Sequence, residues 1–218
     1  MGREVTCRDT GKRGYLSRIS QVPLIVSFYT ENTPYQLEAM SLIASCNAFG
    51  IDAEIEGVPS EGSWERNCAI KPFFIRKKLI EKKRPIFWVD ADAIFKKKPD
   101  FAHLKDSDLA FREMKRFSHD RRFKYFSGSL FLNYTPQGIA FADKWCEHCQ
   151  EKIDKKLDLQ FLDQISLVDL IERGEKVKVH SLPIAYAKVF DIDAQEIEPQ
   201  EVVIEHYQAS RRFRFWKG

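Results

Sequence analysis

The chain has 218 residues, 44% of them hydrophobic and 13% aromatic, which is enough for one sizeable domain with its own core. The net charge of +3 and the lack of a recognisable nucleic-acid motif argue against a dedicated nucleic-acid binder. No stretch approaches the roughly 18 apolar residues of a membrane span, and residues 1–20 lack the apolar segment of a secretory signal. With five cysteines, an odd number, we expect a cytoplasmic protein with reduced thiols.

The first ninety residues predict strand, helix, strand, helix and strand in turn, after an N-terminal extension at 1–21. Residues 22–30 are rich in branched and aromatic side chains, as buried strands are. Residues 51–58 alternate apolar and polar side chains, and residues 86–89 are continuously apolar, so both predict strands. A helix is predicted at 71–84, closed by Pro85. This order favours a parallel sheet covered by helices on both faces.

The helix between the first two strands has a clear start signal. Thr33 is a suitable N-cap, Pro34 suits the first helical position, and Gln36 completes a capping box. Gly50 is expected to end this helix. The apolar face predicted from helical spacing consists of Leu37, Met40, Ala44 and Ala48.

The second half of the chain is less regular. Residues 108–113 and 127–135 predict strands, and residues 138–153 and 160–174 predict helices, the latter ended by Gly174. Short late strands are expected within 177–190 and 201–207.

Two carboxylates follow the third predicted strand, in "FWVDADAIF" (87–95). Asp90 and Asp92 lie two positions apart, so they can point to the same side of a strand end. At about 4 Å in an effective dielectric near 20, two such charges repel by about 4 kcal/mol. A proton, a basic residue or a divalent cation must offset this repulsion, and Mg²⁺ or Mn²⁺ prefers oxygen ligands. In open α/β sheets, ligands bind outside the carboxyl ends of strands.

The residues around this motif resemble those of the GT-A glycosyltransferases, and more closely the nucleotide-diphospho-sugar transferases. The matching segments are "VSFYTENTPY" (26–35), "NCAIKPFFI" (67–75), "FWVDADAIF" (87–95), "SGSLFLN" (127–133), "LDQISL" (162–167) and "VIEHYQASRR" (203–212). The resemblance implies an α/β, GT-A-like (Rossmann-like) fold with a mostly parallel central sheet flanked by helices. It also implies one domain at 22–218, with a nucleotide-binding half at 22–95 and an acceptor and sugar half at 96–218.

The resemblance further implies a metal-dependent transfer of a sugar from a nucleotide-diphosphate donor to an acceptor. The acceptor itself, whether a glycan, a lipid or a protein, is left open. Asp92 would ligate the divalent metal, Mn²⁺ or Mg²⁺, that bridges the diphosphate. Asp90 would contact the donor's ribose or sugar, or the metal through water. His206 matches the place of a further metal ligand.

The remaining site residues are implied in the same way. Asp163 would act as general base toward an acceptor hydroxyl in an inverting enzyme, or would stabilise an oxocarbenium-like sugar in a retaining one. Lys71 would lie near the diphosphate or donor. The nucleoside loop would comprise Tyr29, Thr30, Glu31 and Asn32, and the pocket for the donor sugar and acceptor would include Ser127, Gly128 and Gln164.

Three other interpretations compete. A haloacid-dehalogenase-type phosphatase also uses Asp-x-Asp after an apolar strand, but Ile94 is not the Thr or Val expected there. "WCEHC" (145–149) resembles a thioredoxin redox motif, yet helical spacing places Cys146 and Cys149 in mid-helix, where packing is expected. The tail "RRFRFWKG" (211–218) motivates a non-enzymatic basic surface-binding protein. Within the main interpretation, the tail leaves a peripheral membrane contact open.

Overall fold

A six-stranded mixed sheet forms the centre of the computed structural model, which describes residues 22–213. Its strand order is β2 (Ala53–Val58), β1 (Leu24–Thr30), β3 (Ile86–Val89), β6 (Tyr125–Leu132), β5 (Leu109–Glu113) and β7 (Val179–Ser181). Strand β1 is parallel to both of its neighbours, and β5 is parallel to β7. Only β6 within this sheet runs antiparallel to its neighbours. The expected mostly parallel sheet is therefore confirmed.

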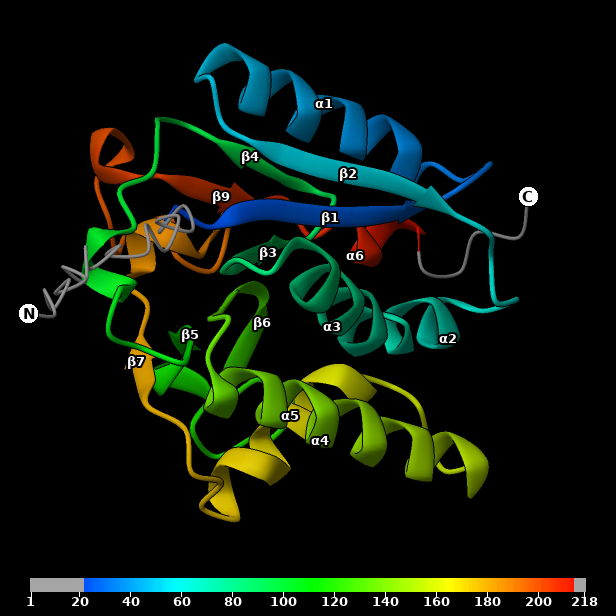
Figure 1. Ribbon diagram of the computed structural model, residues 1–218. Helices are drawn as coiled ribbons and strands as arrows, with labels where there is room; N and C mark the ends of the chain where they lie inside the picture. The colour runs from blue at the N-terminus through cyan, green and yellow to red at the C-terminus, as the bar shows by residue number, and fades with distance from the viewer. Residues whose placement is uncertain (1–21, 214–218) are drawn as a thin grey trace, which may run out of the picture.

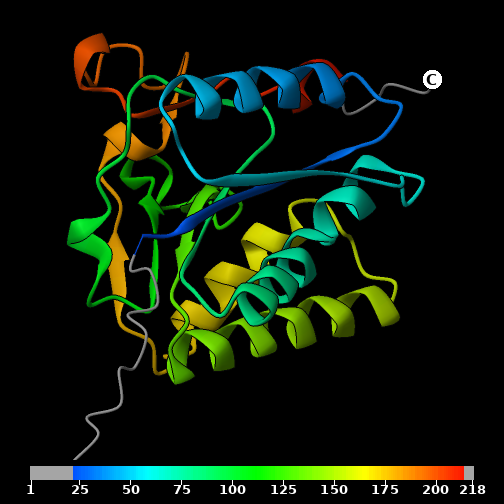
Figure 2. The same ribbon diagram turned by 45° about the horizontal axis from the view of Figure 1, so that its top comes forward.

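Helices cover this sheet on both faces, as Figures 1 and 2 show. One face carries α1 (Tyr35–Ala48) and a small second sheet of β4 (Ala93–Phe95), β9 (Ile204–His206) and β8 (Lys188–Val189). The other face packs against α3 (Lys71–Lys82), α4 (Pro136–Asp154) and α5 (Leu162–Glu172). Shorter elements are α2 (Trp64–Ala69), α6 (Ser210–Phe213) and the 3₁₀ turns Ala102–Leu104, Lys115–Phe117, Ile184–Tyr186 and Pro199–Glu201.

Successive strand residues supply two separate cores, because their side chains point to opposite faces of the sheet. Val26 and Trp88 pack into the core beneath α3, α4 and α5. Ile25 and Phe87 pack into the core beneath α1 and the small sheet. The sheet is buried on both sides, which explains why its strands are continuously apolar. None of the helices within 22–213 is long and apolar enough to cross a membrane. The predicted extension at 1–21 and the tail residues 214–218 lie outside the described residues.

The predicted apolar face of α1 is wrong. Leu37 and Met40 are 69% and 59% exposed, whereas Ala39, Leu42, Ser45 and Cys46 are buried. Apart from Leu42, the inward-facing side chains are small. Strand β4 packs against this helix, and the Ser45 hydroxyl accepts a hydrogen bond from Phe95 N at 3.1 Å. The capping box also does not form, since the N-cap is Pro34 and no side chain caps the helix. The hydroxyl of Thr33 instead donates to the Thr30 carbonyl.

A bulge in β6 changes the face to which its side chains point. The register with β5 jumps from Phe111↔Leu130 to Arg112↔Phe126, which leaves residues 127–129 without regular partners on that side. Ser129 therefore faces the small sheet, where it contacts His206, while Ser127 faces α3 and α5. Without the irregularity, the period of two would place both serines on the same face.

Gly128, at the centre of this bulge, has no room for a side chain. A Cβ there would lie 2.4 Å from a ring carbon of Phe126 and 2.9 Å from an Asp90 carboxylate oxygen. We predict that Gly128→Ala lowers the free energy of unfolding by about 1–3 kcal/mol, the usual cost of overpacking. Urea denaturation would measure this. Gly57→Ala is the control, because its Cβ would meet first the flexible Glu31 side chain. Equal stability of the two variants would contradict the prediction.

Candidate active site

The Asp-Ala-Asp motif occupies the turn by which the chain leaves the large sheet and enters the small one. Strand β3 ends at Val89, and Asp90 N donates to the Gly128 carbonyl at 2.8 Å. Ala93 N donates to the Asp90 carbonyl at 3.0 Å, which closes the turn before β4. Strand β4 then pairs with β9 so that Ala93 lies opposite His206. The topology thus brings a histidine from near the end of the chain beside the two aspartates.

Asp90, Asp92 and His206 form a cluster whose candidate ligand atoms all lie within 4.8 Å of one another. Asp92 Oδ2 accepts a hydrogen bond from Ala209 N at 2.6 Å, but its Oδ1 is buried without a partner. His206 Nε2 is 2.8 Å from Ser129 Oγ, and its Nδ1 is also buried without a partner. These two unpaired atoms are 4.0 Å apart. Buried polar atoms are rarely left unpaired, so this corner is suited to a ligand.

The electrostatics of this cluster fit a divalent cation. Burial, followed by the charge of Asp90, raises the pKa of Asp92 to about 7. Burial lowers the pKa of His206 to about 4, so its imidazole is neutral at physiological pH. When Nε2 donates its proton to Ser129, Nδ1 presents a lone pair toward Asp92. Two carboxylates and a neutral imidazole are ligands that Mn²⁺ accepts.

Lys71 joins Asp90, the first of the two strand-end carboxylates, to the opposite wall of the site. Its Nζ lies 3.1 Å from Asp90 Oδ1 and 2.8 Å from Asp163 Oδ2, and it donates to Ser127 Oγ at 3.2 Å. Burial alone would lower the lysine pKa, but Asp163 and Asp90 together raise it above its usual value. The ammonium therefore stays charged. The Trp88 indole also donates to Asp90 Oδ1, at 2.9 Å.

Asp163 and Gln164 come from the first turn of α5 and face the same space. Ser127 Oγ lies 2.9 Å from Asp163 Oδ2 and 3.2 Å from Gln164 Oε1. The Trp145 indole donates to the Asp163 carbonyl at 3.0 Å and so fixes the start of the helix. The residue before this helix is Phe161, which adopts the left-handed conformation with φ of +57°.

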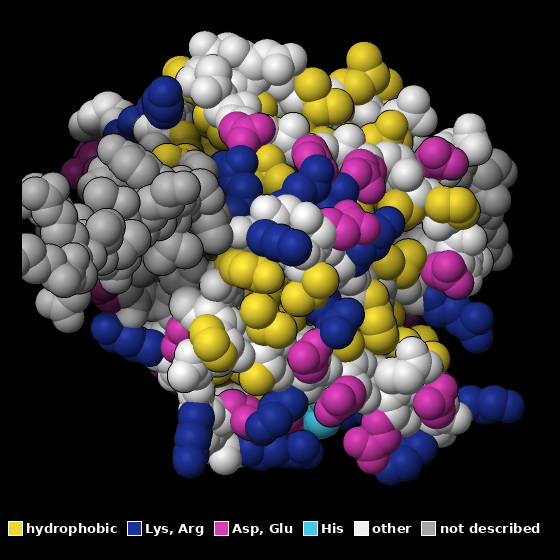
Figure 3. All heavy atoms as spheres, in the orientation of Figure 1, with side chains coloured by type: hydrophobic (Ala, Val, Ile, Leu, Met, Phe, Trp, Pro, Cys, Tyr) yellow, Lys and Arg dark blue, Asp and Glu magenta, His cyan; other side chains and the backbone are white. Residues whose placement is uncertain are grey.

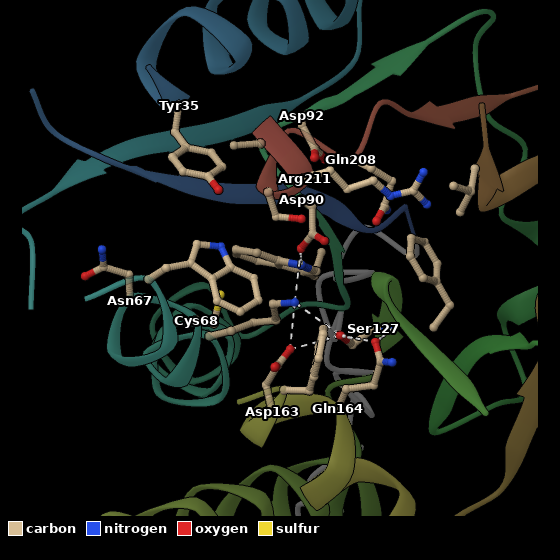
Figure 4. Close-up of a pocket in the computed structure, with 18 of the residues that line it drawn as sticks. Tyr35, Asn67, Cys68, Asp90, Asp92, Ser127, Asp163, Gln164, Gln208 and Arg211 are labelled. Atoms are coloured by element: carbon tan, nitrogen blue, oxygen red, sulfur yellow. Dashed lines mark hydrogen bonds and ion pairs between the residues drawn. The ribbon is translucent and has the colours of Figure 1, made fainter. Parts of the chain in front are cut away.

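These groups line one cavity of about 620 Å³, which Figure 4 shows. Asp90, Asp92, Lys71, Ser127, Asp163 and Gln164 all contribute to its lining. The hydroxyl of Tyr35 points toward the same space as the Asp90 carboxylate and is buried without a hydrogen-bond partner. Nine of the lining residues are aromatic: Phe28, Tyr29, Tyr35, Trp64, Trp88, Phe117, Phe123, Phe126 and Phe161. A largely apolar cavity with a few convergent polar groups is typical of a small-molecule site.

The predicted nucleoside loop is only partly at the cavity. Tyr29 and Thr30 line it, whereas Glu31 and Asn32 are exposed and are not among its lining residues. The Glu31 side chain lies against Gly57 of β2, and Asn32 turns the chain with a φ of +58°. Gly128 does not line the cavity either, but it adjoins Asp90 and so shapes the site from behind.

The sequence analysis did not identify several cavity residues. Tyr35 was not singled out, and α2, which carries Trp64, Asn67 and Cys68, was not predicted. The capping signal of Ser63, whose side chain accepts a hydrogen bond from Arg66 N, could have revealed α2. Arg211, for which a contact with the diphosphate and a solvated basic tail were both considered, lines the cavity and forms an ion pair with Asp191.

The redox interpretation is not supported by the surroundings of the two cysteines. Cys146 and Cys149 lie in the middle of α4, and both are buried. Burial raises the pKa of each thiol to about 12, which is opposite to the activation that redox cysteines require. The expectation that these cysteines pack in the core is confirmed.

The surface offers little support for a dedicated basic binder. On the face shown in Figure 3, acidic and basic side chains are interspersed. Arg76, for example, is exposed and is paired with the partly exposed Asp143. Alternating charges of this kind are typical of an ordinary solvated surface.

No protein-family model and no curated protein matches the chain. Several solved structures, however, are similar to it. A glycosyltransferase involved in the glycosylation of the major capsid of PBCV-1 is similar at a TM-score of 0.64 and 13% identity, over 85% of this chain and 92% of that one. The glycosyltransferase GlyE of Streptococcus pneumoniae TIGR4 is similar at 0.53 and 16% identity, and its apo form at 0.54 and 14%. The chain spans 54% of the GlyE chain in each case.

These likenesses define the fold. The chain has the α/β fold of these glycosyltransferases, so the expected GT-A-like architecture is confirmed. The haloacid-dehalogenase alternative gains nothing from the comparisons.

Removing the central lysine tests its role in the folded protein. We predict that Lys71→Met lowers the free energy of unfolding by about 3–5 kcal/mol, because it leaves Asp90 and Asp163 without their shared buried cation. Lys77→Met is the matched control on the same helix; its side chain is exposed, and we expect a change within about 0.5 kcal/mol. Chemical denaturation of both variants would measure these changes in the free energy of unfolding. A Lys71 variant as stable as the Lys77 variant would show that the lysine does not hold the site together.

Asp92 and His206 give opposite pH dependences to the metal-free protein. The raised pKa of Asp92 gives stability at low pH that is lost as the pH rises toward 7. The lowered pKa of His206 causes stability to be lost as the pH falls from 6.5 toward 4. We predict that Asp92→Asn, in chelator at pH 8, is more stable than wild type by on the order of 1 kcal/mol or more. Below pH 6.5 its stability should fall on acidification. A variant less stable than wild type at pH 8 would contradict this.

Proposed function

We propose that the protein is a metal-dependent glycosyltransferase that moves a sugar from a nucleoside-diphosphate donor to an acceptor. The observation that carries this proposal is the pair of unpartnered buried atoms, Asp92 Oδ1 and His206 Nδ1, beside the cavity. The shared fold with known glycosyltransferases supports it independently.

Asp90, Asp92 and His206 would hold the metal, Mn²⁺ or Mg²⁺. When bound, the ion would offset the negative charge that gathers on the diphosphate as the sugar leaves. The same ion would also neutralise the negative charge of Asp92 in the site itself. Lys71 is paired with Asp90 and Asp163, so Asp92 lacks a cation of its own within the described residues. A divalent ion would keep Asp92 ionised at a pH where burial otherwise favours its proton.

The donor would lie across the cavity between the two halves of the chain. The half at 22–95 supplies Tyr29, Thr30 and the unpartnered Tyr35 hydroxyl on the side where the nucleoside is proposed to bind. The second half supplies Arg211, whose guanidinium would add positive charge near the diphosphate. Burial raises the pKa of Tyr35 above its usual value, so the hydroxyl remains protonated and can donate a hydrogen bond.

Ser127, Asp163 and Gln164 would contact the donor sugar and the acceptor. Lys71 and Ser127 both donate to Asp163 Oδ2 and so fix the orientation of the carboxylate. In an inverting enzyme, Asp163 would take the proton of the acceptor hydroxyl. In a retaining enzyme, it would stabilise positive charge on the sugar. A cytoplasmic location and a membrane contact through the basic tail remain predictions.

A thermal-shift panel of UDP-, GDP- and CDP-sugars, each with and without Mn²⁺, tests this function. We predict a metal-dependent stabilisation by one nucleotide class, of about 2.7 kcal/mol when the ligand is at 100 times its Kd. Asp92→Ala should abolish that stabilisation. Asp106→Ala, which changes an exposed carboxylate outside the cavity lining, should retain it.

Two results would contradict the proposal. One is the absence of any nucleotide-dependent shift in the wild type. The other is donor hydrolysis by Asp92→Ala at the wild-type rate, which would show that Asp92 is not a metal ligand.

A further inference from the structure

Three phenylalanine rings from two separate parts of the chain form one continuous apolar side of the cavity. Phe117 and Phe123 flank the exposed segment between β5 and β6, and Phe161 precedes α5. The ring centroids of Phe161 and Phe123 are 5.3 Å apart, and those of Phe123 and Phe117 are 6.0 Å apart. We call this set the phenylalanine wall. All three rings keep contact with solvent, and Phe123 is 37% exposed, so a ligand could bury them.

The phenylalanine wall leads away from the corner where the donor is proposed to bind. Trp64 lies near the Tyr35 hydroxyl at one end, without the geometry of a hydrogen bond, and lies 5.9 Å from the Phe161 ring at the other. Phe123 and Phe117 continue the series beyond Phe161. The order of rings therefore runs from the nucleoside side toward the opposite edge of the cavity.

The near end of the wall meets the proposed catalytic carboxylate. Asp163 follows Phe161 by two residues, at the start of α5. Gln164 Nε2 donates to the Arg122 carbonyl, which ties the same helix turn to the backbone next to Phe123. A molecule lying on these rings would thus have polar partners at one edge, at the place where its hydroxyl would react.

The backbone of Phe161 indicates that the position of this ring is enforced. A bulky residue at a φ of +57° is strained, and glycine would relieve the strain. The ring packs edge-on against both Trp64 and Phe123, and this packing holds the backbone in that conformation. Strain of this kind is found preferentially at ligand-binding positions.

We propose that the phenylalanine wall is the acceptor subsite and that it binds a carbohydrate ring, an inference that rests on the proposed function. A pyranose has an apolar C–H face, which suits the rings, and hydroxyls at its edge, which suit Asp163 and Gln164. A lipid chain would need an apolar path leading outward. The outer edge is instead charged, since Lys115, Arg116 and Arg122 are exposed beside Phe117 and Phe123.

Ligand-observed NMR on the full chain tests the proposal without knowledge of the natural acceptor. The probes are methyl hexopyranosides, maltose, cellobiose and lactose, with decyl phosphate as the lipid probe, all in the presence of Mg²⁺ and pyrophosphate. The variants are Phe161→Gly, which keeps the backbone conformation but removes the ring, and Phe123→Ala. Phe190→Ala is the control, because Phe190 is exposed but is not among the cavity-lining residues.

We expect at least one glycan to bind the wild type and the Phe190 variant, and to bind the two wall variants about tenfold or more weakly. Binding of Mg²⁺–pyrophosphate should be the same in all four proteins. The inference is overturned if no glycan binds, if decyl phosphate binds in place of the glycans, or if the wall variants bind glycan normally. Loss of Mg²⁺–pyrophosphate binding in the wall variants would also overturn it, by assigning the wall to the donor.

A failure of the proposed function would look different from these outcomes. The wild type would then not bind Mg²⁺–pyrophosphate, whereas a glycan response that depends on Phe161 and Phe123 would persist.

Discussion

Lys71 places one positive charge between the carboxylates of Asp90 and Asp163, and this contact joins parts of the chain that are far apart in sequence. Asp90 follows β3, Asp163 begins α5, and the lysine begins α3. All three elements lie around the same end of the large sheet. Because the lysine is buried, its charge is weakly screened and must be neutralised locally. The same contact leaves Asp92 without a cation, and this imbalance is what makes the neighbouring corner suitable for a metal ion.

The fold supplies this arrangement through two local irregularities. The turn after β3 carries the chain from the large sheet into the small one, so the two aspartates lie where the sheets meet. The bulge in β6 then turns Ser127 toward Lys71 and Ser129 toward His206. One strand therefore supports both the lysine cluster and the metal cluster, from opposite faces. Irregularities of this kind are common beside functional sites because they redirect single side chains.

The sequence predicted the order of the main elements because their hydrophobic periods are strong. The buried strands β1 and β3 and the helices α4 and α5 lie close to where the pattern indicated. The orientation of α1 was missed for a physical reason. Apart from Leu42, its inner face is small and partly polar, with Ser45 bonded to the β4 backbone, whereas Leu37 and Met40 face solvent. Hydrophobic spacing does not readily reveal a helix that packs through one leucine and several small residues.

The candidate site was predictable where it depended on the motif and not where it depended on tertiary contacts. Asp90, Asp92 and His206 are brought together as the resemblance implied. Gly128 is the one mark of the β6 bulge in the sequence, because a glycine inside a strand often indicates a bulge. The left-handed conformation of Phe161 has no marker in a single sequence, since that position is not a glycine. Tyr35 illustrates the same limit. Its significance lies in a hydroxyl without a partner, which only the packed structure displays.

Anomalous diffraction from a crystal soaked with Mn²⁺ and a nucleoside diphosphate tests the central claim most directly. The account predicts a manganese peak in contact with Asp92 Oδ1 and His206 Nδ1, the two buried atoms that have no partner in the free protein. A nucleotide bound in the cavity with no metal at this corner, or with those two atoms turned apart, would contradict it.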